Sequence, residues 1–164
     1  MHSAKTSSLL TPHPSLLTMF SLRPATAADA AAIRALVYAA RINPTGLEWR
    51  RFVVALSPDG MVIGCGQVKP HRDGSRELAS IVSAPAWRGN GVARAMIEHL
   101  IDINPGPLYL TCRARLEPFY EKFGFRTVGA DDMTPYFRKL SRLARMVGFV
   151  GLGKERLLVM FRPG

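Results

Sequence analysis

The sequence contains few cysteines and no long apolar run. Cys65 and Cys112 lie far apart and belong to no CxxC motif and no paired Cys/His spacing, so we expect neither a disulfide framework nor a metal site. Free cysteines fit a reducing compartment, and the cytoplasm is the simplest location. No apolar stretch approaches the roughly 18 residues of a membrane-spanning helix, so we expect a soluble protein without a membrane partner.

Acidic residues are scarce as well. Asp and Glu number 12 against 22 Lys and Arg, which gives a formal net charge of +10. A surplus of this size attracts anions in general, including nucleotides, nucleic acid, acidic proteins and lipid headgroups, and it does not choose among them. The charge therefore indicates an anionic partner without naming one.

The sequence does contain enough apolar material for one core. Of 164 residues, 48% are hydrophobic and 21% are charged, which is typical of a single globular domain. Residues 1–18 differ, because they are rich in Ser and Thr, are interrupted by Pro12 and Pro14, and carry Lys5 as their one charged side chain at neutral pH. We expect a disordered extension over 1–18 and one domain over 19–164.

Apolar periodicity predicts a sheet with helices around it. Segments with strand character occur at 20–23, 52–56, 61–70, 77–83, 108–112, 125–129 and 156–161. Helical patterns occur at 26–43, 45–51, 91–103, 118–124 and 135–147, and a glycine-spaced reversal at 148–155. Short turns between 52 and 83 predict an antiparallel meander, whereas the helix after residue 83 predicts a crossover to a parallel strand. The predicted fold class is α/β or α+β, with a mixed, mostly antiparallel central sheet flanked by helices.

The segment WRGNGVARAMIEHLI, residues 87–101, has two glycines directly before an amphipathic helix. The first amides of a helix lack intrahelical partners and lie at the positive end of the helix dipole, so they form an anion site. Gly89 and Gly91 let an anion approach the backbone, and Arg88 and Arg94 add positive charge. The segment predicts a pyrophosphate cradle, and a glycine-rich helix entry without a ligand is the open alternative.

Two common phosphate-binding motifs do not fit this segment. A P-loop requires a Lys after its second glycine, and none follows here, which disfavours a nucleotide triphosphatase. A dinucleotide fingerprint requires a third Gly or Ala where Arg94 stands, and an acidic residue about 20 positions further on, near Tyr109.

The residues RGNGVA, 88–93, match the signature R/Q-x-x-G-x-G/A, and on them the chain resembles the GCN5-related N-acetyltransferase (GNAT) superfamily. Other features of that superfamily occur in the expected order. They are LRPAT at 22–26 before a capped helix, ELASIVSAP at 77–85 directly before the loop, and FYEKFGF at 119–125 after it. The resemblance spans about 20–161 and indicates the superfamily, not the acceptor.

The resemblance implies that the co-substrate acetyl-CoA lies in a splayed gap between the strands at 77–83 and 108–112. Backbone groups of Ile81 and Ser83 would pair with the pantetheine arm, an amide there could polarise the thioester carbonyl, and the loop amides would hold the pyrophosphate. Many members have Asn where Arg113 stands, and here Arg113 or Arg115 could meet a phosphate of CoA. The implied cofactor-binding residues are Ile81, Val82, Ser83, Arg88, Gly89, Asn90, Gly91, Val92, Ala93, Arg94 and Arg113.

The resemblance also implies two catalytic residues. Tyr120 matches the tyrosine that in many members donates a proton to the departing thiolate, and the alternative is a half-buried core aromatic. Glu77 matches a carboxylate that serves as base, often through water, and the alternative is a glutamate paired with Arg76 or Lys69. His71 is a second candidate for the base, or else a solvated turn residue.

The implied function is an acetyl-CoA-dependent N-acetyltransferase, in which a primary amine of a small molecule, peptide or protein attacks the thioester directly. The alternative is a non-catalytic CoA-binding regulatory module. A basic nucleic-acid-binding protein is less favoured, because no strand platform interleaves aromatic and basic residues. Residues 136–164 contain seven basic side chains against Glu155, and we hypothesise that they border the acceptor groove and favour an acidic acceptor or the 3′-phosphate of CoA. The acceptor and the oligomeric state, a homodimer included, stay open.

Overall fold

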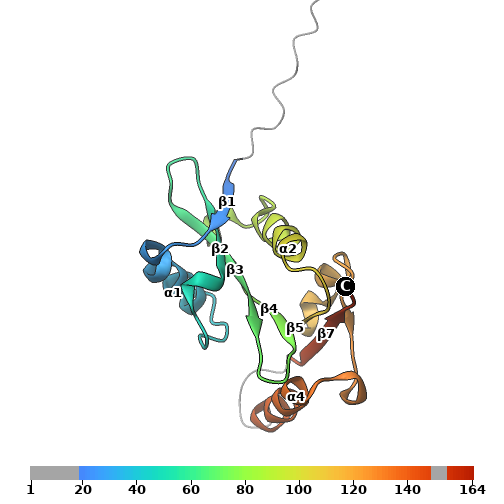
Figure 1. Ribbon diagram of the computed structural model, residues 1–164. Helices are drawn as coiled ribbons and strands as arrows, with labels where there is room; N and C mark the ends of the chain where they lie inside the picture. Colours follow the sequence, from blue (N-terminus) through green and yellow to red (C-terminus); the bar gives the residue numbers. More distant parts are fainter. Residues whose placement is uncertain (1–18, 149–154) are drawn as a thin grey trace, which may run out of the picture.

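The computed structural model describes residues 19–148 and 155–164. The predicted extension 1–18 and residues 149–154 of the predicted reversal lie outside the described residues. Within these, seven strands form one sheet in the order β1-β2-β3-β4-β5-β7-β6 (Figure 1). The strands are β1 Ser21–Pro24, β2 Phe52–Leu56, β3 Val62–Pro70, β4 Arg76–Ser83, β5 Leu108–Arg113, β6 Arg126–Thr127 and β7 Leu157–Arg162. The α-helices are α1 Ala30–Ala39, α2 Val92–Ile103, α3 Glu117–Glu121 and α4 Pro135–Gly148.

Strand pairing confirms the predicted mixed sheet. β1 to β4 form an antiparallel meander in which each strand pairs with the next one. α2 carries the chain from the end of β4 back to the start of β5, so these two strands are parallel. β7 pairs antiparallel with both β5 and β6. The ladder between β4 and β5 is one residue pair, Glu77 opposite Tyr109.

Side chains alternate between the two faces of the sheet, and each face has its own helices. The face that packs on α2 and α3, here called the α2 face, buries Met96 and Leu100 of α2. On the opposite face, called the α1/α4 face, α1 buries Ile33 and Val37 and α4 buries Phe137. α1 contacts β3 and β4 whereas α4 contacts β7, so the two helices cover different parts of this face (Figure 1).

The first helix begins with the predicted cap. The Asp29 carboxylate accepts a hydrogen bond from the Thr26 amide at 2.7 Å and pairs with the Arg23 guanidinium at 2.7 Å. The hydrogen bond from Arg23 lowers the pKa of Asp29 to about 2, against the opposing effect of burial. This ion pair connects β1 to the start of α1.

Four segments differ from the sequence prediction. α1 ends at Ala39, before the predicted end at residue 43, and Arg41 just beyond it has a left-handed φ of +54°. Residues 45–51 form only one 3₁₀ turn, Trp49–Arg51, because Gly46 takes a left-handed φ of +68°. β6 is shorter than the predicted strand 125–129: its ladder to β7 consists of Arg126 and Thr127, and a 3₁₀ turn follows Gly129. α3 ends at Glu121, and Gly124, with φ of +85°, lies in the turn after it.

Candidate active site

A bulge interrupts the pairing of β3 with β4. Cys65 pairs with Val82 and Gln67 with Ala79, so β4 has one residue more than β3 across this stretch. Ser80, within the bulge, has a φ of +58°, which is uncommon for a residue other than glycine. Gln67 Nε2 donates to Ser80 Oγ at 3.0 Å and holds the bulge from β3.

Beyond the bulge, β4 and β5 separate. Their one ladder pair lies at the start of both strands, whereas the opposite edge of β5 pairs with β7 along the whole strand. Among the described residues, the edge of 81–83 that faces β5 therefore has no strand partner. The edge lies where the superfamily resemblance implied a splayed gap, and the pantetheine contact stays a prediction.

The loop after β4 has the backbone geometry of an anion site. Gly89 and Gly91 have left-handed φ values of +81° and +80°, and a Cβ added at either would meet nothing within 4 Å. Gly91 is the N-cap of α2 and provides no side chain to cap the helix. In the described part of the chain, the amides of residues 91–94 donate to no carbonyl or side-chain acceptor. Arg88 is exposed beside them, and Arg94 pairs with Glu98 at 3.7 Å.

Tyr120 lies on the α2 face. It belongs to α3, packs against the core beneath α2, and its ring is 5.2 Å from that of Phe119 in an edge contact. Burial, with a smaller contribution from the neighbouring Cys112, raises the pKa of Tyr120 to about 12. The phenol therefore keeps its proton at neutral pH and can act as a donor.

Glu77 lies on the α1/α4 face and is only 5% exposed. Its Oε2 atom is 2.9 Å from His71 Nε2, and Thr111 Oγ1 donates to its Oε1 atom at 3.3 Å. Arg76 and Lys69, the partners considered from sequence, instead donate to the carbonyl oxygens of Pro105 and Thr45. The carboxylate is thus held by a turn residue and by the neighbouring strand.

His71 is not a solvated turn residue. Its side chain is 10% exposed, and its ring stacks on Tyr136 of α4 with centroids 3.5 Å apart. The sequence could not reveal this contact, because Tyr136 lies far along the chain in a helix whose position depends on the fold. Thr111 was missed for the same reason.

Glu77 belongs to a group of buried polar residues between α1 and α4. Gln67, Lys69 and Ser80 are each less than 10% exposed on the same face. Burial lowers the pKa of Lys69, and the nearby charge of Glu77 opposes that effect. The Oε1 atom of Gln67 has no hydrogen-bond partner among the described residues. Strand alternation within β3 could have placed Gln67 and Lys69 on one face, whereas Ser80 lies on the face of Glu77 only because of the bulge in β4.

The start of α4 is fixed by the turn between β3 and β4. The Tyr136 amide donates to Asp73 Oδ2 at 2.9 Å. Burial alone would raise the pKa of Asp73, but hydrogen bonds from Ser75 and from this amide hold it well below its usual range. Arg138 donates to the carbonyl oxygens of Ala130 and Met133, whereas Lys139, Arg142 and Arg145 of the predicted basic helix are exposed.

Arg113 and Arg115 both pair with Glu155. The distances are 3.6 Å and 3.0 Å, and both arginines are more than half exposed. A phosphate would therefore compete with Glu155 for them, and the cofactor contact of Arg113 stays a prediction.

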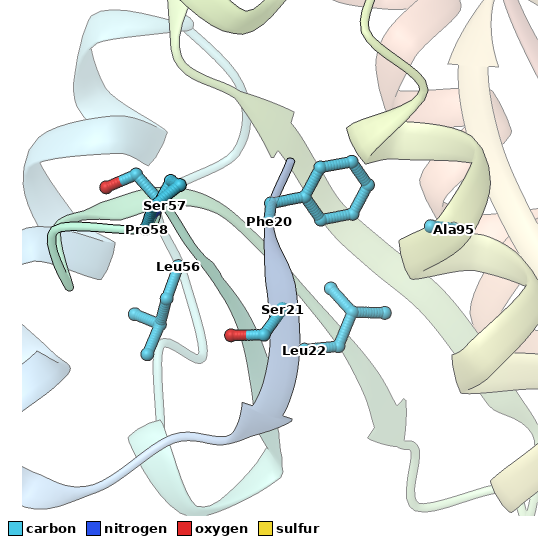
Figure 2. Close-up of a pocket in the computed structure, with 7 residues that line it drawn as sticks. All are labelled: Phe20, Ser21, Leu22, Leu56, Ser57, Pro58 and Ala95. Atoms are coloured by element: carbon cyan, nitrogen blue, oxygen red, sulfur yellow. The ribbon is translucent and has the colours of Figure 1, made fainter. Parts of the chain in front are cut away.

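A separate hollow of about 580 Å³ lies between β1, the end of β2 and α2 (Figure 2). Figure 2 labels the residues that line it, which include Phe20, Leu22 and Ala95, and none of them is titratable. The hollow therefore offers no acid or base. Across residues 19–148 and 155–164, no group of three or more His, Cys, Asp or Glu side chains could hold a metal ion. In the same ranges, no helix has the length and apolarity to cross a membrane.

The splayed mixed sheet, with a glycine-rich turn before the crossover helix, defines an acyl-CoA N-acyltransferase-like fold. Residues 48–127 match the family model described as the acetyltransferase (GNAT) domain. This match confirms, over 80 of the 164 residues, the GNAT resemblance that the motifs indicated.

Solved structures share this fold. N-acetylglutamate synthase from Neisseria gonorrhoeae, complexed with coenzyme A and N-acetyl-glutamate, superposes with a TM-score of 0.69 at 19% identity over 88% of this chain. This chain covers only 35% of that enzyme's length. Rv2747 from Mycobacterium tuberculosis, in complex with CoA and NLQ, superposes with a TM-score of 0.66 at 21% identity. The superposition covers 88% of this chain and 99% of Rv2747.

The ribosomal-protein-S18-alanine N-acetyltransferase from Escherichia coli gives a TM-score of 0.62 at 19% identity, over 88% of this chain and 94% of its own. At these sequence identities the superpositions show a shared fold and nothing more. No curated protein matches the sequence.

Proposed function

We propose that the protein is an acetyl-CoA-dependent N-acetyltransferase in which a primary amine attacks the thioester directly. The observation that carries the proposal is the gap between β4 and β5, with a protonated phenol on one face of the sheet and a buried carboxylate on the other. The family match supports an acetyltransferase in general. We take residues 19–164 as one catalytic domain, and the two buried free thiols are consistent with a cytoplasmic location.

The donor side of the proposed site consists mostly of backbone. The unpaired edge of 81–83 would hold the pantetheine arm in strand fashion, and the amides of residues 91–94 would hold the pyrophosphate. Arg88 is free to add charge at that end, since it is exposed. The solved relatives whose names mention CoA support this assignment.

The chemistry requires a base for the acceptor amine and an acid for the departing thiolate, and the two candidates lie on opposite faces of the sheet. An amine attacks only in its neutral form, so the Glu77 carboxylate takes a proton from the acceptor ammonium, directly or through water. The amine nitrogen then forms the new bond to the acetyl carbon while the carbon–sulfur bond breaks. Tyr120 donates its proton to the departing thiolate, and the proton that the nitrogen loses as the amide forms restores the Tyr120 phenol.

The acceptor side would lie on the α1/α4 face, where Glu77 is found. α4 covers part of this face and carries Arg142 and Arg145 exposed. The basic segment could attract either an acidic acceptor or the 3′-phosphate of CoA. The position of α4 favours the acidic acceptor, because the proposed phosphate-binding loop leads into α2, on the opposite face. The acceptor class is thus a primary amine with negative charge nearby.

Thiol release from acetyl-CoA over a panel of amines tests the proposal. Glu77→Gln should lower kcat/KM by about 10²- to 10⁴-fold and Tyr120→Phe by a similar or smaller factor, the usual range for general acid–base catalysis. Both variants should retain CoA binding, measured as thermal stabilisation by CoA. CoA binding with no turnover of any amine would indicate the regulatory module instead, and salt-dependent binding to random DNA would favour a nucleic-acid protein.

A further inference from the structure

The two hydrogen bonds that Glu77 accepts leave its carboxylate able to accept another one. An ionised carboxylate only accepts hydrogen bonds, so His71 Nε2 at 2.9 Å and Thr111 Oγ1 at 3.3 Å both act as donors here. The Nε2 atom of His71 therefore carries a hydrogen in this contact. A carboxylate has about four lone-pair sites, and these two partners occupy one on each oxygen. The remaining sites can receive the acceptor ammonium or a water.

The His71 ring is fixed from two directions. Its backbone amide donates to the Ser75 carbonyl at 2.9 Å within the β3–β4 turn. Its ring lies flat against Tyr136, at an interplanar angle of 18°, and edge-on to Phe137 with centroids 5.5 Å apart. Tyr136 is itself held by its amide bond to Asp73 in the same turn. The turn and α4 together aim Nε2 at the carboxylate.

We propose that His71 is a positioning residue for the reaction. It donates a hydrogen bond to Glu77 and orients the carboxylate, so that Glu77 can take the acceptor proton. In this step an N–H bond of the acceptor ammonium breaks and an O–H bond forms on Glu77, while His71 keeps its own proton. The inference rests on the proposed function and adds a residue that acts through the base.

Other charged groups face this pair from each neighbouring element. Lys69 of β3 stands opposite Glu77 in the ladder, but its ammonium donates to the Thr45 carbonyl at 2.9 Å. Tyr136 of α4 lies near both Glu77 and Asp73, whose charges, after burial, raise the pKa of its phenol. β5 contributes the neutral hydroxyl of Thr111. Without His71, Thr111 would be the one hydrogen-bond donor to Glu77 among the described residues.

Two substitutions at His71 distinguish the role of its N–H donor from the role of its aromatic ring. His71→Phe keeps an aromatic ring against Tyr136 and removes the N–H, whereas His71→Gln keeps an amide N–H near the Nε2 position and removes the ring. We expect His71→Phe to lower kcat by about 10- to 100-fold, the scale of a hydrogen bond to a charged group, with the KM of acetyl-CoA unchanged. His71→Gln should retain most of the activity, because it keeps an N–H that can donate to the carboxylate.

The outcomes distinguish this inference from the proposed function. Wild-type kcat in His71→Phe would overturn the role of His71, even with Glu77→Gln inactive. Equal losses in His71→Phe and His71→Gln would also overturn it, because the N–H would not be what matters. Full activity in Glu77→Gln, or no turnover by the wild type, would instead reject the proposed function and the inference with it. If His71→Phe does not fold, His71→Asn replaces it, since the shorter amide does not reach the carboxylate.

Discussion

The two faces of the sheet are built in different ways. On the α2 face, the glycine loop, the start of α2 and Tyr120 all come from residues 77–125, and the predicted donor contacts are mostly backbone amides. On the α1/α4 face, Glu77 is held by side chains from the β3–β4 turn and β5, and its histidine partner is held by α4. A contiguous backbone motif can recognise one unchanging acetyl donor, acetyl-CoA. An assembly of side chains from distant parts of the sequence can be altered to suit different amine acceptors.

Substitution of Gly91 should disturb the α2 face most strongly. An L side chain at a left-handed φ costs roughly 1–2 kcal/mol, and the loop would relieve the strain by turning its amides away. We expect Gly91→Val to weaken CoA binding by about tenfold or more, measured by calorimetry. Gly60→Val is the matched control, because Gly60 has φ of +83° and equally open surroundings in the turn after β2. It should lose stability but bind CoA as the wild type does, and equal losses of affinity would contradict the loop assignment.

Substitution of Asp29 tests the ion pair with Arg23, which connects β1 to the start of α1 and lies outside the proposed catalytic residues. The pKa of Asp29 is lowered to about 2, so its stabilisation is fully present above the ordinary value of 3.8 and is lost as pH falls from there through about 2. We expect Asp29→Asn to reduce the free energy of unfolding by about 1–2 kcal/mol at pH 7, a figure reduced for the exposure of Arg23. In urea denaturation, the gap to wild type should shrink between pH 4 and pH 2. The exposed Asp131→Asn variant should show no such gap, and a pH-independent gap would reject the ion-pair explanation.

The basic surface of α4 should give the smallest effect. Replacing Arg142 and Arg145 by Gln should raise the KM of an acidic acceptor about two- to fivefold at low ionic strength, because exposed charges attract weakly and are screened by salt. The KM of acetyl-CoA should not change. The same charge removed at Lys122 and Arg126 provides the control. An altered acetyl-CoA constant would place the helix at the donor end instead.

Much of the α2 face could be predicted from sequence because its signals are local. Gly89 and Gly91 mark left-handed backbone, the 3.6-residue period after them marks α2, and SPDG and HRDGS mark the turns of the meander. The catalytic and cofactor-binding roles came from resemblance, and they stay predictions.

The α1/α4 face was harder to predict because its contacts depend on register and on tertiary packing. No propensity places Ser80 at a φ of +58°, since the bulge arises from how β3 and β4 align. His71 looked like a turn residue because its turn is polar, and only the position of α4 buries it.

The single ladder pair between β4 and β5 has a consequence for the order of folding. The meander β1 to β4 closes through neighbouring turns, whereas β5 obtains its full set of backbone partners only from β7, near the end of the described chain. During synthesis the glycine loop can therefore form before β5, which borders the gap opposite β4, is fixed in the sheet by β7. Chains interrupted before β7 would expose β5 as an unpaired edge, and such an edge is prone to aggregation.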